Sequence, residues 1–136
     1  LLKETNITGC HIAHYAAMSG SLACLVWVAE TFPSLMTQKD KAGKSIAHYA
    51  ALGYQATCLT WISAFYPDLL HTRDNSGGLP VHEAIEAPNT RILAWFQTFD
   101  ATSLSATDAK GQTLAHRAAM INATKSLDWL KRHTPS

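Results

Sequence analysis

Residues 43–51 read Gly-Lys-Ser-Ile-Ala-His-Tyr-Ala-Ala, and elements of this stretch recur along the chain at a fixed offset of 34 residues. Five positions carry the same residue in four successive copies. In the second copy these positions are Gly43, His48, Ala50, Leu59 and Trp61. A period of this length is typical of solenoids, in which each unit buries its apolar face against its neighbours.

The offset divides the 136 residues into repeat units. We expect residues 1–5 to be the end of a preceding repeat, because they align with 35–39 and 69–73. The units that follow span 6–39, 40–73, 74–107 and 108–136. With no initiator Met, the sequence is expected to be a segment of a longer protein.

Within each unit the pattern predicts a turn, a short helix, a tight turn, a longer helix and a loop. In the second unit the turn spans 40–43, where Gly43 permits a positive φ. Ser45 is placed to cap a helix over 46–52. After a break at Gly53, a second helix is predicted over 56–65.

The apolar residues of the second helix are expected to form the core. Cys58, Leu59, Trp61 and Ile62 form one apolar stripe, so we expect the four tryptophans to form a buried ladder between units. The cysteines are expected to be free, buried thiols, because helix spacing exceeds the reach of a disulfide. The tryptophans and cysteines concerned are Trp27, Trp61, Trp95, Trp129, Cys10, Cys24 and Cys58.

These residues resemble the ankyrin repeat, whose core is Gly-x-Thr-Pro-Leu-His-x-Ala-Ala. Residues 111–119 and 77–84 match it best, and the resemblance covers nearly the whole chain. It implies an all-α ankyrin-repeat solenoid of stacked helix-turn-helix units joined by short hairpin loops. Tetratricopeptide repeats share the period, but the turn-rich segment 67–76 leaves no room for two long helices.

The copies depart from the family pattern at several positions. Ile12, Ile46 and Leu114 stand where the family has Pro, and His11 and Leu79 stand where it has Thr. The resemblance therefore indicates a divergent array.

The repeat geometry argues against a metal site. His14, His48, His82 and His116 are equivalent positions on successive units, about 8 to 10 Å apart, whereas zinc ligands converge within about 2.1 Å of one ion. The resemblance implies instead that this histidine hydrogen-bonds the backbone of the adjacent turn. For the tryptophans, an aromatic cage for a methylated lysine is the alternative to burial, since some ankyrin domains form one.

Composition limits the function classes. Net charge is +1 and 15% of residues are charged, which favours neither nucleic-acid binding nor an acidic tail. The sequence shows no apolar run of membrane-spanning length and no catalytic nucleophile motif. We therefore expect a cytoplasmic, monomeric protein that is not an enzyme, with no cofactor, no membrane partner and no nucleic-acid partner.

The resemblance implies protein binding on the concave face formed by hairpin tips and short helices. An apolar anchor of the partner is expected near the first two short helices, oriented by charges further along; packing of Tyr15 and Tyr49 between units is the alternative. The candidate partner-binding residues are Tyr15, Met18, Lys41, Lys44, Tyr49, Leu52, Asn75, Glu83, Glu86, Lys110, Arg117 and Met120.

A second hypothesis is a targeting or autoinhibitory domain of a larger enzyme. Divergent arrays of this kind also occur in secreted effectors of intracellular bacteria, for which the compartment would be the host cytoplasm. Both are analogies with the family.

Overall fold

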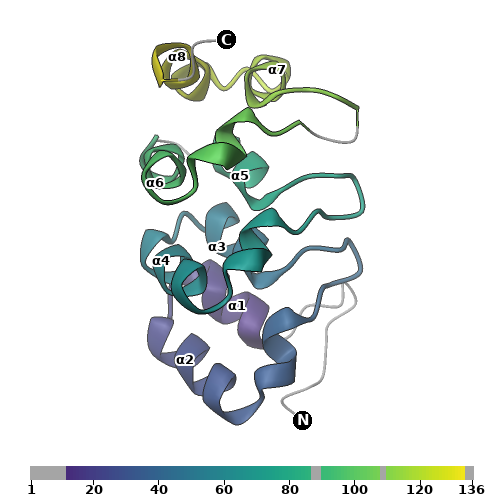
Figure 1. Ribbon diagram of the computed structural model, residues 1–136, viewed down its shortest axis with the longest axis vertical. Helices are drawn as coiled ribbons and strands as arrows, with labels where there is room; N and C mark the ends of the chain where they lie inside the picture. Colours follow the sequence, from purple (N-terminus) through teal and green to yellow (C-terminus); the bar gives the residue numbers. More distant parts are fainter. Residues whose placement is uncertain (1–11, 87–89, 108–109, 134–136) are drawn as a thin grey trace.

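A computed structural model describes residues 12–86, 90–107 and 110–133 of the chain. Every regular element in these ranges is helical. Helix pairs follow one another along the long axis of the molecule, and the loops that join them project from the side of the short helices (Figure 1). The expectation of an all-α protein is confirmed for these ranges.

Each pair consists of a short inner helix and an outer helix. The pairs are α1 (Ile12–Ser19) with α2 (Leu22–Thr31), α3 (Ile46–Leu52) with α4 (Ala56–Phe65), α5 (Pro80–Glu83) with α6 (Arg91–Phe99), and α7 (Leu114–Met120) with α8 (Thr124–His133). Four short 3₁₀ helices complete the described elements: η1 (Pro33–Thr37), η2 (Pro67–His71), η3 (Ala84–Glu86) and η4 (Ala101–Ser105). The predicted helices at 46–52 and 56–65 are confirmed at both ends.

A histidine in the first turn caps three of the short helices. The amide N–H of Ser45 donates to Nδ1 of His48 at 3.1 Å, and the same bond joins Leu79 to His82 at 2.8 Å. In α7 the Thr113 amide donates to His116 Nδ1, and Thr113 Oγ1 accepts from the His116 amide. In these three helices the sequence repeat thus fixes where the helix begins, because one residue pair satisfies an otherwise unpaired backbone donor.

Small residues bring the inner helices close together. Ala50 and Ala51 are fully buried, and α3 contacts both α1 and α5. Gly53 stands where a Cβ atom would lie 2.0 Å from the carbonyl oxygen of Met18. The break after α3 therefore needs glycine for close approach to α1, while the left-handed conformation falls on Tyr54, at φ 59°.

The outer helices supply much of the core. The prediction that the four tryptophans form a buried ladder is wrong, because they differ in burial. Leu59 and Ile62 of α4 are fully buried. Trp95 is buried, Trp61 is only partly buried, and Trp27 is 47% exposed. Tryptophan lies at one edge of the apolar stripe, so its burial depends on what the preceding outer helix places over it.

The thiol prediction also needs a correction. Cys58 is buried in α4, whereas its repeat equivalent Cys24 is exposed in α2. Both are free thiols, as predicted. In the described ranges no outer helix precedes α2, so the flank that carries Cys24 and Trp27 has no equivalent cover. Cys10 lies outside the described residues.

Candidate functional site

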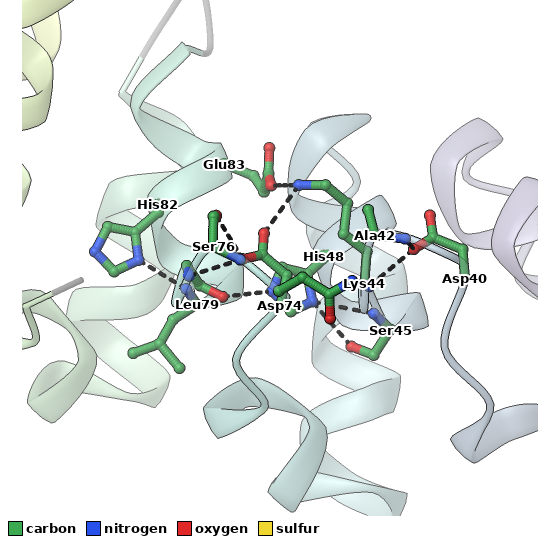
Figure 2. A network of polar contacts seen from close by, with 12 residues as sticks. Asp40, Ala42, Lys44, Ser45, His48, Asp74, Ser76, Leu79, His82 and Glu83 are labelled. Atoms are coloured by element: carbon green, nitrogen blue, oxygen red, sulfur yellow. Dashed lines mark hydrogen bonds and ion pairs between the residues drawn. The ribbon is translucent and has the colours of Figure 1, made fainter. Parts of the chain in front are cut away.

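Two hairpins on the loop side are built around an aspartate at the same repeat position. The carboxylate Oδ1 of Asp40 accepts from the amides of Ala42 and Lys44, both at 2.9 Å. Asp74 repeats this arrangement, accepting from Ser76 at 2.9 Å and Gly78 at 2.8 Å (Figure 2). Each aspartate thus folds its own loop around one oxygen.

Hydrogen bonds tie the second hairpin to the first. The Asn75 amide donates to the carbonyl oxygen of Ala42, and its side-chain Nδ2 donates to that of Lys41, both at 2.8 Å. Buried beneath these bonds, His48 Nε2 lies 2.9 Å from the carbonyl oxygen of Gly78. Because Nδ1 of His48 accepts from Ser45, Nε2 carries the proton and donates to Gly78. The predicted role of this histidine is confirmed at His48.

Ion pairs connect the same two units. Lys44 Nζ lies 3.3 Å from Asp74 Oδ2 and also contacts Glu83 Oε1, so the ammonium bridges a hairpin and the short helix α5 (Figure 2). Burial favours neutral Lys44, but hydrogen bonds and charge from Glu83 and Asp74 outweigh it and raise its pKa above 10.5. These partly desolvated charges stabilise the stacking of neighbouring units.

The electrostatics of the aspartates follow from their bonds. Burial alone would raise the pKa of Asp74, but hydrogen bonds from the Ser76 hydroxyl and the Gly78 and Ser76 amides, together with Lys44, lower it from 3.8 to about 2. For Asp40, burial is likewise outweighed by the Tyr49 hydroxyl and the Lys44 and Ala42 amides, which lower its pKa. Both carboxylates are therefore held ionised.

Four of the predicted partner-binding residues take part in this network. Lys44, Asn75 and Glu83 join the units as described, and the hydroxyl of Tyr49 donates to Asp40 Oδ2. The Tyr49 ring also lies 4.9 Å from that of His14, between centroids. The alternative interpretation, packing between units, thus describes the contacts of Tyr49. Tyr49 and Glu83 share one repeat position, and both contact hairpin residues.

The remaining predicted residues differ in exposure. Tyr15 is 47% exposed, Met120 is 69% exposed, and Lys41 and Lys110 are exposed as well. Those that are partly buried are Met18, Leu52 and Arg117. Glu86 ends η3, and its side chain is outside the described part of the structure.

The structure brings three predicted residues together near the C-terminal end of the stack. Lys110, Arg117 and Met120 line a surface hollow of about 260 Å³, which we call the loop-side hollow. Its other lining residues are Ser76, Gln112 and Ile121. A hollow with two cationic side chains beside exposed apolar ones suits a partner that carries an acidic group next to an apolar side chain.

Two residues of this region carry little signal in the sequence, Arg73 and Ile121. Arg73 donates from one guanidinium nitrogen to the carbonyl oxygens of Gly77 and Thr107, each at 2.7 Å, which joins the second hairpin to the following loop. Its only sequence signal is a basic residue at the same position of the preceding unit, Lys39. Ile121 is 48% exposed in the loop-side hollow, although its position predicted only a helix break.

Neither a metal centre nor a membrane span emerges from the described ranges. No group of three or more metal-ligating side chains gathers there. None of the helices in those ranges has both the length and the apolar character needed to cross a bilayer. No protein-family model and no curated protein matches this sequence.

Proposed function

We propose that this chain is a protein-interaction module, an ankyrin-type solenoid that binds a partner protein with its hairpins and short helices. The observation that carries the proposal is the exposure of apolar side chains beside charges on a side made rigid by bonds between units. Tyr15 and Met120 are exposed from α1 and α7, while His48 and Asn75 fix one hairpin against the next. Rigid surfaces lose little entropy on binding.

The chemistry of the surface supports an apolar contact oriented by charge. Met and aromatic side chains are enriched at interface cores, and Met adapts to irregular partners. In the loop-side hollow, Met120 lies beside Lys110 and Arg117. The proposal includes a reducing, cytoplasmic compartment, which the free thiols of Cys24 and Cys58 favour.

Affinity capture with the purified chain, followed by identification of the retained proteins, tests this function. The captured partner is then titrated against Tyr15→Ala, Arg117→Ala and Met120→Ala. We expect at least one of these to weaken binding by more than about 1 kcal/mol. Thr57→Ala and Lys125→Ala, on the outer helices, are the matched controls and should bind as the unchanged chain does.

If the controls abolish binding while the three variants on the hairpin side bind normally, the proposed surface is wrong. A retained enzyme whose activity falls on binding would favour an inhibitory role. Both outcomes are decided by titrating the purified partner against each variant, because capture alone does not measure affinity.

A further inference from the structure

The outer helices carry a second row of aromatic side chains, on a surface that the proposed function does not use. Trp61 lies 5.3 Å from Phe65 between ring centroids, and Trp95 stacks on Phe99 at 4.9 Å. Phe65 and Phe99 are 66% and 53% exposed. Outer helices α2 and α4 together contain a single charged residue, Glu30. Exposed apolar patches with few charges are a common feature of interaction sites on proteins.

Two neighbouring contacts between outer helices differ in how the tryptophan is covered. Between α4 and α6, the indole N–H of Trp95 donates to Thr60 Oγ1 at 2.9 Å, and Trp95 is buried. Between α2 and α4, the position of Thr60 is taken by Val26, which offers Trp61 no acceptor. At the α2–α4 contact the hydroxyl that Trp95 uses is therefore replaced by a methyl group, and Trp61 lines a hollow beside Val26.

That space is a hollow of about 360 Å³, which we call the outer hollow. Its lining residues are Val26, Ala29, Glu30, Trp61, Phe65 and Tyr66. The volume is at the small end of the range for ligand pockets and suits one long side chain more than a cofactor. Glu30 is exposed and is the only charged residue of the lining.

We propose that the outer hollow receives the side chain of an arginine from a partner protein. Charge complementarity selects the occupant: three aromatic rings and one carboxylate attract a cation, and the lining holds no positively charged side chain. A planar guanidinium can lie on the face of Trp61 or Phe65 while it donates to the Glu30 carboxylate. The Trp61 N–H is then available to a carbonyl oxygen of the partner backbone.

The probe for this site is N-acetyl-arginine methylamide, with the citrulline analogue as its uncharged, nearly isosteric control. The ¹⁵N-labelled full chain is titrated with each compound, and the four tryptophan indole N–H signals are followed by NMR. Single Trp→Phe variants assign the signals. We expect the Trp61 signal to shift with saturation at millimolar arginine derivative, and the citrulline derivative to bind at least about threefold more weakly.

Glu30→Gln should weaken binding of the arginine derivative by about threefold, because one surface charge contact is lost. Asp128→Asn removes the same charge from outer helix α8 and should change nothing. The proposal is overturned if the Trp61 signal does not move or if all four indole signals move alike. It is equally overturned if the citrulline derivative binds as well, or if Glu30→Gln has no effect.

Discussion

At the scale of single residues, His48 shows how one side chain joins two units. Its Nδ1 accepts from Ser45 at the start of α3, and its Nε2 donates to Gly78 in the next hairpin. Burial of the ring lowers the pKa of His48, although the bond to Gly78 and nearby carboxylates oppose the shift. The neutral ring is required, because only that form can both accept and donate.

Replacement of this histidine should be far more costly than replacement of its exposed repeat equivalent. His48→Ala leaves the buried amide of Ser45 without its partner and removes one of the two hydrogen bonds that the Gly78 carbonyl oxygen accepts, the other coming from the Asp74 amide. We expect it to lower the free energy of unfolding by about 2 to 3 kcal/mol. His116→Ala loses only a helix cap and should cost about 1 kcal/mol. Urea unfolding followed by circular dichroism measures both; equal losses would contradict a role between units.

Acid should weaken the stack at Asp74. Its folded pKa, about 2, is below the ordinary 3.8, so its stabilisation is complete above pH 3.8 and is lost as pH falls toward 2. The stability difference between the unchanged chain and Asp74→Asn should be constant from about pH 7 to pH 5 and shrink below about pH 4. A constant difference down to pH 2 would show that the carboxylate charge is not what matters.

We expect protonation of His48 to cause a separate loss of folding stability at milder acidity. Because its pKa is lowered from 6.5, its contribution is complete above pH 6.5 and is lost as pH falls through the folded value. The two groups are therefore distinguishable by the pH range in which their variants converge with the unchanged chain.

At the scale of elements, the contact between α1 and α3 depends on one missing side chain. A Cβ on Gly53 would lie 2.0 Å from the Met18 carbonyl oxygen, so Gly53→Ala must push the two helices apart. We expect a loss of about 3 kcal/mol. Ile121→Ala, an exposed change at the same repeat position, should cost about 0.5 kcal/mol. Similar midpoints in thermal unfolding would show that α1 and α3 are not packed as described.

The outer helices give a second test at this scale. Trp95 is 7% exposed and donates to Thr60 of the preceding outer helix, whereas Trp27 is 47% exposed. Trp95→Ala should cost about 3 to 5 kcal/mol, but Trp27→Ala about 1 kcal/mol. Chemical denaturation of the two variants measures this contrast; a uniform ladder would make the costs equal.

At the scale of the whole molecule, the sequence predicts most of the helix pattern because each unit repeats its local signals. Turn glycine, capping histidine and apolar stripe lie at the same offsets, and α3 and α4 begin and end where predicted. The burial of individual side chains is harder to predict, because the residues that cover a side chain belong to the neighbouring unit. Thr60 over Trp95 and Val26 near Trp61 occupy one column and give different surroundings.

The candidate site shows the same limit. The column of Tyr15, Tyr49, Glu83 and Arg117 was predicted as a binding row from its repeat position. In the structure Tyr49 and Glu83 contact Asp40 and Lys44, whereas Tyr15 is exposed. These contacts depend on which residues the adjacent hairpin presents. The residues at one repeat position do not reveal what lies opposite them in the next unit.

We propose that a partner binds the side formed by the hairpins and short helices. Hydrogen–deuterium exchange of the chain with and without its captured partner tests it most directly, with mass spectrometry locating the protected peptides. We predict slower exchange within 41–52 and 110–120, the segments that hold Lys41, Leu52, Lys110 and Met120. Protection confined to α2, α4, α6 and α8, with these segments unchanged, would contradict the claim.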